Sequence, residues 1–408
     1  MMATCRICDQ TYEQFISFGE MPIANGFLTP AEFDTEYFFE LRLGFCPGCY
    51  MVQLIEQPDR EMMFHQDYAF FSSLSKGQQL HFKQLADKLL SDYLDEENAF
   101  AVEIGSNDGI MLRNIAAAGV THLGVEPSKN VAEVAKQHGV NTVSQFFDEN
   151  LAAKIIAEYG RASTISSANV ICHIPYMHSV LAGVKRLLKP TGVFIFEDPY
   201  LGDIVEKTSY DQVYDEHVFY FSVSSVSNML IRHELEIFDV EPLPVHGGSM
   251  RYYIANKGSR EINPRVQVQL DYERELGLQL PETYAGLRAR IEKSRDDLRA
   301  LLQSVCDRQG KPVIAYGATS KSTTVLNYCE IGPELVDFIS DTTPIKQGKF
   351  SPGMHIPIKS PEHIQKQQPD YMLLFAWNHM QEIIEKETDF KGRGGQWLVY
   401  VPEVGLVG

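Results

Sequence analysis

The sequence contains no apolar run long enough to cross a bilayer, since no stretch of its 408 residues approaches about 18 apolar positions. Its first residues, MMATCRICDQTYEQF, lack the apolar core of a secretion signal. A basic excess is also missing, because the formal net charge is −18. Such a charge opposes nonspecific binding to nucleic acid or to anionic membranes, although it allows a local basic pocket for a phosphorylated ligand. We therefore expect a soluble cytoplasmic protein without nucleic-acid or membrane partners.

Internal repeats and low-complexity tracts are absent from the sequence as well. Cysteine is sparse: there are seven, and Cys172, Cys306 and Cys329 are scattered singly. These three are expected to be reduced core residues rather than disulfide partners, which suits a reducing cytosol. The apolar fraction of 44% is normal for globular proteins and allows large cores. The chain length predicts two or three domains.

The other four cysteines form two CxxC motifs near the N-terminus. Cys5 and Cys8 are followed, after 37 intervening residues, by Cys46 and Cys49. Two such motifs can offer four thiolates to one tetrahedral Zn²⁺, which would be structural because no coordination position stays open. A redox CxxC, or four unrelated buried cysteines, are the alternatives. Metal binding would stabilise a segment too small to build its own core.

Beyond the cysteines, strand-like and helix-like segments alternate twice along the chain, which predicts an α/β protein with parallel sheets. Residues 1–65 are expected to consist of short loop-like stretches around the metal. The first α/β unit has expected strands at 100–104, 122–126, 163–171 and 192–197 and expected helices at 77–94, 112–118, 128–138 and 224–233, and it closes with two antiparallel strands at 237–240 and 250–256. A polar stretch at 256–264 and long helices at 266–278 and 283–308 follow. The second unit has expected strands at 312–316, 336–340, 371–376 and 397–401 and a helix at 323–329. We predict a zinc-binding module at 1–65, a central domain at 66–257 and a second Rossmann-like domain at 258–408.

The motif VEIGSNDG (102–109) lies between an expected strand and an expected helix. Glycines at such a turn let the backbone approach a ligand and leave helix N–H groups exposed. Gly105 and Gly109, with Asn107 between them, do not form the GxGxxG motif of NAD-binding proteins and fit S-adenosylmethionine (SAM) methyltransferases better. Glu126, 21 residues after Gly105, can accept hydrogen bonds from both ribose hydroxyls. An ordinary tight turn and a surface glutamate are the alternative. Glu103 and Asp108 are expected near the methionine end of the cofactor or in hydrogen bonds of the loop, with solvated surface as an equal alternative.

Two dense polar segments follow the last two expected parallel strands of this unit. The first runs from Asn169 through His173 to Tyr176, and the second covers 197–200 and 214–222. Residues beyond the carboxyl ends of parallel strands face the ligand crevice, so both segments should meet the cofactor. Histidine suits proton transfer near neutral pH, and Tyr214 or Glu216 could orient it. For any single histidine, a packing or helix-capping role is the alternative.

The second α/β unit has a glycine turn of its own, from Gly317 to Lys321. Lys321 at a helix start is well placed to meet a phosphate. Lys346 and Lys349 flank another loop, and Trp377 follows a strand end. Solvated surface is the alternative for these lysines. We expect this unit to hold the nucleotide end of a substrate.

Taken together, the motifs resemble the sugar C-methyltransferase family that acts on nucleotide-linked deoxy-keto sugars. They follow one another along the whole chain: CRIC, CPGC, DYAFFSS (67–73), VEIGSNDG, VEPS (125–128), ICHIPY (171–176), FEDPYLGDI (196–204), YDEHVFYFS (214–222), PVHGGSMR (244–251), YGATSKS (316–322) and SDTTPIKQGKFSPG (340–353). The resemblance is to the C-3′-methyltransferases of dTDP-4-keto-deoxysugars. It implies a zinc-binding N-terminal module, a central SAM domain, a C-terminal Rossmann-like domain, a nucleotide-sugar in the cleft between the last two, and a monomer.

The resemblance also implies roles for single residues. His217 matches the base that removes a proton beside the 4-keto group, giving an enolate whose carbon takes the methyl group. Candidate catalytic residues are His217, Glu216, Tyr214, His173 and Tyr68; candidate SAM-binding residues are Gly105, Asn107, Gly109, Glu126 and Asn169; candidate substrate-binding residues are Tyr200, Tyr220, His246, Lys321, Lys346 and Trp377. Tyr214, Tyr68, His173 and Asn169 are candidate donors to the enolate oxygen.

Two other functions compete with this prediction. An O- or N-methyltransferase of a small metabolite would need a base but no donor for an enolate oxygen. A zinc-containing binding module with two inactive Rossmann-like domains would have no SAM affinity, and the crowded polar loops speak against it.

Overall fold

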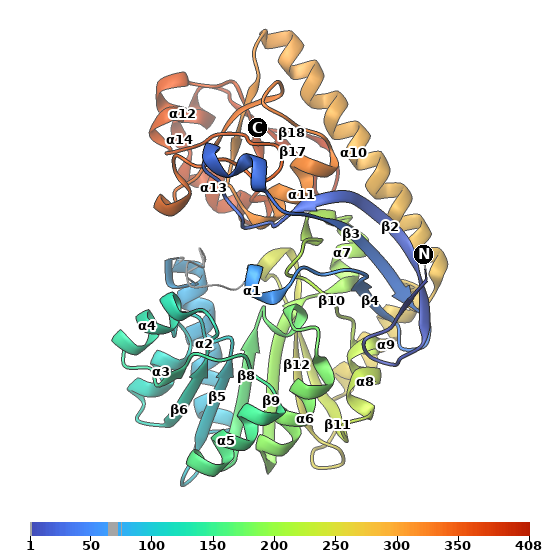
Figure 1. Cartoon of the computed structure of the whole chain (residues 1–408), viewed down its shortest axis with the longest axis vertical. Coiled ribbons are helices and arrows are strands. Elements are labelled where there is room, and N and C mark those ends of the chain that lie inside the picture. Colours follow the sequence, from blue (N-terminus) through green and yellow to red (C-terminus); the bar gives the residue numbers. More distant parts are fainter. Residues whose placement is uncertain (1, 64–71, 75) are drawn as a thin grey trace.

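A computed structural model describes residues 2–63, 72–74 and 76–408, and its strands form three sheets (Figure 1). The N-terminal sheet is antiparallel, with the order β1-β2-β3-β4-β10. Its strands are β1 (Met2–Thr4), β2 (Thr11–Pro22), β3 (Phe38–Cys46), β4 (Met51–Leu54) and β10 (Phe219–Tyr220). The short helices η1 (Pro30–Thr35) and α1 (Arg60–Met63) accompany it. The expectation of mainly loop-like stretches here was wrong, because β2 resumes its pairing with β3 after each of two register shifts, the second of which contains Gly19.

The middle sheet has the order β11-β12-β9-β8-β5-β6-β7. Strands β5 (Phe100–Ile104), β6 (Thr121–Val125), β7 (Thr142–Val143), β8 (Ala162–Ala168) and β9 (Leu188–Pro199) are parallel, whereas β11 (Leu235–Leu243) and β12 (Ser249–Asn256) are antiparallel. Its helices are η2 (Ser72–Leu74), α2 (Lys76–Asp92), α3 (Leu112–Ala117), α4 (Lys129–Gln137), α5 (Glu149–Tyr159), η3 (Ile171–His173), α6 (Met177–Leu187), α7 (Leu201–Lys207), η4 (Tyr210–Gln212), α8 (Val223–Ile231) and η5 (Val245–Gly247). All five residues of β5 are buried, as expected for a parallel strand covered on both faces. The predicted antiparallel closing pair is confirmed.

The C-terminal sheet has the order β15-β14-β13-β16-β17-β18. Strands β13 (Val313–Tyr316), β14 (Val336–Ser340), β15 (Ile358–Lys359), β16 (Tyr371–Leu374) and β17 (Gln396–Val399) are parallel, and β18 (Gly405–Val407) is antiparallel. Its helices are α11 (Ser320–Tyr328), η6 (Pro344–Lys346), α12 (Glu362–Gln367), η7 (Trp377–His379), α13 (Met380–Lys386) and α14 (Thr388–Gly392). The α/β fold class predicted from the sequence is confirmed.

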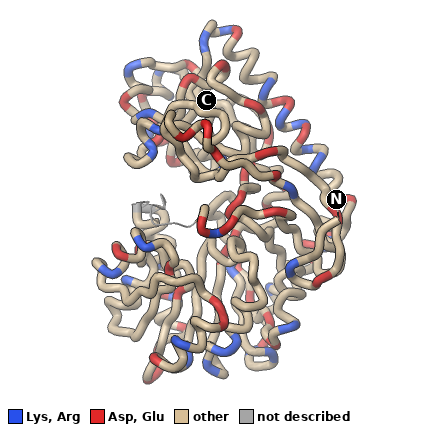
Figure 2. Tube along the Cα trace, in the orientation of Figure 1, with Lys and Arg blue, Asp and Glu red and all other residues tan. Residues whose placement is uncertain are grey.

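Two helices connect the middle and C-terminal sheets: α9 (Pro264–Glu275) and α10 (Pro281–Gln309). Helix α10 starts with Pro281 at its first turn and ends at Gly310 in the left-handed conformation, the expected start and stop signals. Charges of both signs alternate along its outer face (Figure 2), where Arg288 pairs with Glu292. Its inner face packs on the N-terminal sheet, with the rings of Phe45 and Tyr284 stacked 4.3 Å apart.

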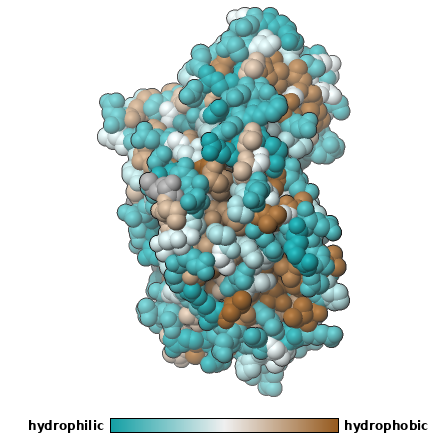
Figure 3. Space-filling model, turned by 90° about the vertical axis from the view of Figure 1, so that its right-hand side faces the viewer, coloured by the Kyte–Doolittle hydropathy of each residue, from teal (hydrophilic) through white to brown (hydrophobic). Residues whose placement is uncertain are grey.

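The N-terminal sheet is packed against both of the larger units. Its residues share one apolar cluster with the middle sheet, through Cys46 and Met51, and a second with α10 and the C-terminal sheet, through Phe18 and Leu43. Figure 3 shows a face on which hydrophilic and apolar residues are mixed. Within the described residues no helix combines the length and apolar content needed to cross a membrane. The N-terminal sheet thus bridges the two α/β units, beside the ends of their sheets (Figure 1).

Candidate active site

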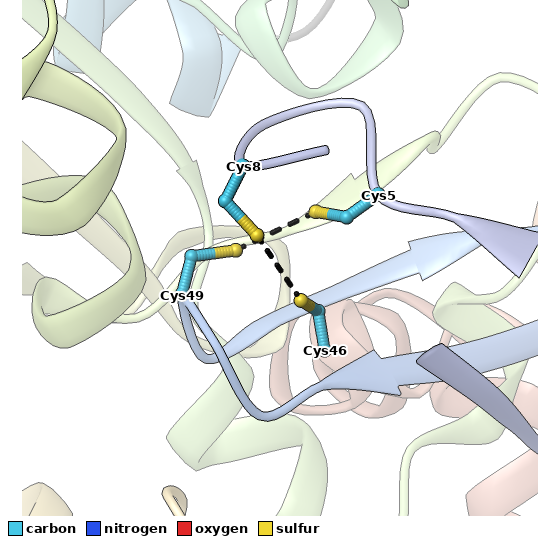
Figure 4. Close-up of side chains that lie close together, drawn as sticks. All are labelled: Cys5, Cys8, Cys46 and Cys49. Carbon is cyan, nitrogen blue, oxygen red and sulfur yellow. Dashed lines mark hydrogen bonds between the residues drawn. The ribbon is translucent and has the colours of Figure 1, made fainter. Parts of the chain in front are cut away.

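The four predicted metal ligands converge on one point (Figure 4). Their sulfur atoms all lie within 4.8 Å of one another, with Sγ–Sγ distances of 3.5 Å between Cys5 and Cys49 and 3.4 Å between Cys8 and Cys46. Tetrahedral zinc with Zn–S bonds of about 2.3 Å places its sulfurs about 3.8 Å apart, so the set fits this metal. Gln53 Nε2 and the Ile7 amide both donate to Cys5 Sγ, which supports a thiolate ligand. The zinc is structural, because four sulfurs fill its coordination sphere.

The predicted glycine turn follows β5 and faces a cavity of about 740 Å³. Gly105 has φ +71°, and a Cβ there would overlap the Val170 side chain, so this position requires glycine. Glu126 at the end of β6 accepts hydrogen bonds from the amides of Asn107 (3.0 Å) and Ser128 (2.8 Å). Burial raises the pKa of Glu126 to about 7. Gly105, Asn107 and Glu126 line the cavity beside Asn169.

The loop at residues 212–217, which carries His217, forms part of the cavity wall. The main-chain carbonyl of Gln212 can only accept a hydrogen bond, so His217 Nδ1, 2.9 Å away, must carry a proton. His217 Nε2 is therefore the acceptor for the Tyr214 hydroxyl at 2.7 Å. Burial, followed by the neighbouring His173, holds the pKa of His217 well below its ordinary value of 6.5. The imidazole is neutral at physiological pH and its basic nitrogen is held by a tyrosine at the cavity.

Two further predicted histidines lie beside this pair. The rings of His173 and His217 are stacked with their centroids 5.2 Å apart, and burial lowers the pKa of His173 to about 3. His246, whose pKa burial also lowers to about 3, contacts the side-chain nitrogens of Asn169 and Gln78, each at 3.2 Å. All three histidines line the cavity. The structure thus brings together His173 after β8, His217 in the loop between η4 and β10, and His246 in the turn before β12.

The far end of the cavity is built by the C-terminal sheet. Lys321, at the start of α11, donates to the carbonyl of His246 at 3.3 Å and lies 5.1 Å from the centre of the Trp377 ring. Lys346 donates to the carbonyl of Ala318 at 2.7 Å. Burial lowers the pKa of both ammonium groups. Both lysines line the cavity, so the structure supports neither as plain solvated surface.

Several predicted residues lie elsewhere. Tyr200 is buried and donates to Glu273 at 2.9 Å, Tyr220 is buried in β10, and neither lines the cavity. Trp377 donates to Asp211 at 2.6 Å, and it supports Lys321 without lining the cavity itself. A Cβ at Gly109 would lie 2.8 Å from the Val140 side chain, so this glycine permits close packing of the turn rather than ligand contact. Tyr68 lies outside the described residues.

Other residues line the cavity without having been predicted. Asn25 comes from the turn after β2, and Arg60 from α1, where its guanidinium lies 4.2 Å from the centre of the Phe146 ring. Asp341 ends β14 and accepts from the amides of Ala318 (2.8 Å) and Thr343 (2.7 Å). Of these three, only Asp341 could have been predicted from the sequence, because an acid directly follows the second strand of a unit whose first strand ends in a glycine turn.

Comparisons with known proteins agree with this arrangement. Three family models match in order: a putative zinc binding domain (residues 5–64), a methyltransferase domain (78–240) and a C-methyltransferase C-terminal domain (244–402). The C-methyltransferase NovU of Streptomyces niveus is 35% identical over 403 residues, which cover 98% of this chain and 95% of the relative. A ubiquinone biosynthesis O-methyltransferase of Methylococcus capsulatus is 28% identical over 98 residues, 24% of this chain and 41% of the relative.

Solved structures resemble a smaller part of the chain. The magnesium protoporphyrin IX methyltransferase ChlM of Synechocystis, with bound S-adenosylhomocysteine (SAH), is 14% identical, has a TM-score of 0.34 and covers 44% of this chain and 84% of its own. A likeness of this size carries no argument about activity. The relative that spans nearly the whole chain does: this protein belongs to the family of SAM-dependent C-methyltransferases with an N-terminal zinc-binding domain.

Proposed function

We propose that this enzyme methylates C-3′, the carbon next to the ketone, of a nucleotide-linked 4-keto-deoxysugar, as a step in deoxysugar biosynthesis. The observation that carries the proposal is the His217–Tyr214 pair. It places a neutral imidazole and a hydroxyl on the wall of a cavity that has a SAM-type crevice at one end and two half-buried lysines at the other. Methyl transfer to carbon needs both a base and a donor for the adjoining oxygen.

The residues at the first end of the cavity fit the methyl donor. Asn107, Glu126 and Asn169 surround the glycine turn, and Glu126 offers carboxylate oxygens to ribose hydroxyls. When bound, SAM supplies a methyl group on a positively charged sulfonium. Asn107, Glu126 and Asn169 would hold that cofactor in the crevice.

The proton is handled by His217. The 4-keto group makes the neighbouring C–H acidic, and His217 Nε2 is the nitrogen that can accept, because Nδ1–H is bonded to the carbonyl of Gln212. Tyr214 donates to Nε2 at 2.7 Å. When that hydroxyl turns to the developing enolate oxygen, it stabilises the negative charge and releases the Nε2 lone pair for the carbon-bound proton. His173 and Asn169 border the same space as further donors.

The nucleotide end of the substrate is assigned to the C-terminal sheet. Lys321 and Lys346 bring two ammonium groups to the mouth of the Gly317 turn, where a diphosphate would offset the cost of their burial. We also propose the three-domain division at residues 1–65, 66–257 and 258–408, and a cytoplasmic monomer.

Proton exchange tests the proposal directly. The wild-type enzyme is incubated with the nucleotide-linked keto-sugar and SAH in D₂O. It should introduce deuterium at C-3′, and His217→Asn should not. Deuterium at C-5, the other carbon beside the ketone, would contradict the C-3′ assignment. Methylation of a hydroxyl or amine without any exchange would overturn the carbon mechanism.

A further inference from the structure

The turn after β2 carries the N-terminal sheet into the cavity. It is a tight turn. The amide of Gly26 donates to the carbonyl of Ile23 at 3.0 Å, and the amide of Phe27 donates to the carbonyl of Asn25 at 3.0 Å. Asn25 is half-buried and lines the cavity, although it lies almost 200 residues before His217 in the sequence. A residue of the zinc-binding region thus borders the candidate active site.

Three hydrogen bonds fix this turn between the two larger units. The Ala24 amide donates to Asp215 Oδ1 at 2.9 Å, and Thr323 of α11 donates to the Ala24 carbonyl at 2.9 Å. Asn25 Nδ2 donates to Glu216 Oε1 at 2.7 Å. Asp215 and Glu216 immediately precede His217, so the turn holds the two residues that lead into the candidate base. Neither Ala24 nor Asp215 is exposed, which makes this contact an internal part of the fold.

The orientation of the Asn25 amide follows from its partner. A carboxylate oxygen accepts, so the nitrogen of Asn25 must face Glu216 and the oxygen Oδ1 must point the other way. Oδ1 is not enclosed, and within residues 2–63, 72–74 and 76–408 no donor is bonded to it. Asn25 lines the cavity, so this unbonded oxygen is a hydrogen-bond acceptor that a ligand there can use.

We infer that Asn25 is a substrate-positioning residue: its N–H holds the Glu216 carboxylate beside the base, and its carbonyl oxygen receives a hydroxyl or amino donor of the sugar. The inference rests on the proposed function and deepens it. It gives the N-terminal sheet a share in recognising the sugar, in addition to its structural zinc.

Asn25→Ala tests the role. Losing one hydrogen bond to the sugar and the anchor of a carboxylate should raise the KM for the nucleotide-sugar about 10- to 100-fold. SAH affinity by calorimetry, zinc content and the thermal midpoint should stay close to those of the wild type. Thr35→Ala, on the exposed face of η1 in the same region, is the matched control and should leave KM unchanged.

A double-mutant cycle keeps the test independent of folding. Asn25→Asp places two carboxylates together and should be worse than Asn25→Ala, whereas Asn25→Asp with Glu216→Gln restores an N–H···O pair in the reverse direction. We expect this double variant to bind the nucleotide-sugar at least as well as Glu216→Gln alone. Losses that simply add would overturn the pairing of Asn25 with Glu216.

The remaining outcomes separate the inference from the proposed function. An active wild type combined with an unchanged KM in Asn25→Ala, or with kcat and thermal stability falling together at constant KM, would overturn the role of Asn25 and leave the proposed function standing. A wild-type enzyme that neither exchanges nor methylates the keto-sugar would overturn the proposed function and, with it, the sugar-facing role of Asn25.

Discussion

The glycine turns of the two α/β units share one hydrogen-bonding plan and differ in charge. In the middle sheet, Glu126 accepts from the amide of Asn107 in the turn and from the amide two residues after itself. In the C-terminal sheet, Asp341 accepts from Ala318 in the turn and again from the amide two residues on. Both turns therefore use an acid at the end of the second strand as a brace.

The difference lies in the lysines nearby. Among the described residues that line the cavity, every lysine comes from the C-terminal part of the chain: Lys321, Lys346 and Lys386. The end beside the middle sheet instead has a single arginine, Arg60, whose guanidinium lies over the Phe146 ring, and burial raises the pKa of Glu103 well above its ordinary value. A crevice with several lysines suits a phosphorylated ligand. One turn geometry is thus used twice, and only the turn of the C-terminal sheet has lysines beside it.

The largest expected effect comes from His217, which lines the cavity between the glycine turns of the two α/β units. His217→Asn removes the base while leaving both turns intact, so kcat should fall about 10²- to 10⁴-fold. SAH and nucleotide affinities, measured by calorimetry, should stay near wild-type values. Unchanged turnover would remove His217 from its role.

Alanine at each turn glycine compares the turns directly. Gly105 and Gly317 both have positive φ, which costs a non-glycine residue about 1–2 kcal/mol. A Cβ at Gly105 would also overlap Val170, adding about 1–3 kcal/mol, whereas one at Gly317 would lie 3.3 Å from Ala376 Cβ. Denaturant unfolding should therefore show a larger loss for Gly105→Ala. Gly119→Ala, at positive φ in open space, reports the backbone cost alone. Equal losses at Gly105 and Gly317 would contradict the packing argument.

Removing one cation should affect one crevice only. Lys321→Met keeps the length of the side chain and should raise the KM for the nucleotide-sugar about 10-fold or more, since a hydrogen bond to a charged group is lost. SAH affinity should not change. Lys83→Met, at an exposed site of α2, is the control. A parallel loss of SAH affinity would show that Lys321 also affects binding at the middle-sheet end of the cavity.

The smallest expected effect is a pH dependence confined to the first crevice. Because the pKa of Glu126 is raised to about 7, its carboxylate is mostly present at pH 8 and mostly protonated at pH 6. SAH affinity should therefore fall up to about 10-fold between pH 8 and pH 6. Glu126→Gln should bind SAH weakly with this pH dependence removed. A dependence that persists in that variant would point to another group.

The sequence predicted both α/β units because their strands are continuous buried runs bounded by clear turns. It missed β7 and β15, since two-residue strands carry no periodic signal, and it left α5 and α6 unassigned. The strand β2 was hidden because its register shifts break the alternation of buried and exposed residues.

For the site, the rule that ligands bind at the carboxyl ends of parallel strands led to the prediction of Glu126, His173 and His217, and all three line the cavity. It could not separate them from Tyr200, which follows the same strands but turns inward to the buried Glu273. Asn25 could not be predicted from the sequence, because its position at the cavity depends on how the N-terminal sheet packs against the other two sheets.

Strand β10 has a consequence for cutting the chain into pieces. Phe219 and Tyr220, just after His217, pair with Gln53 and Val52 of β4. A fragment ending near residue 65 would leave the edge of β4 without its neighbour, and such open edges invite self-association. Anyone exchanging zinc-binding regions between relatives should therefore transfer the residue 214–222 loop together with them.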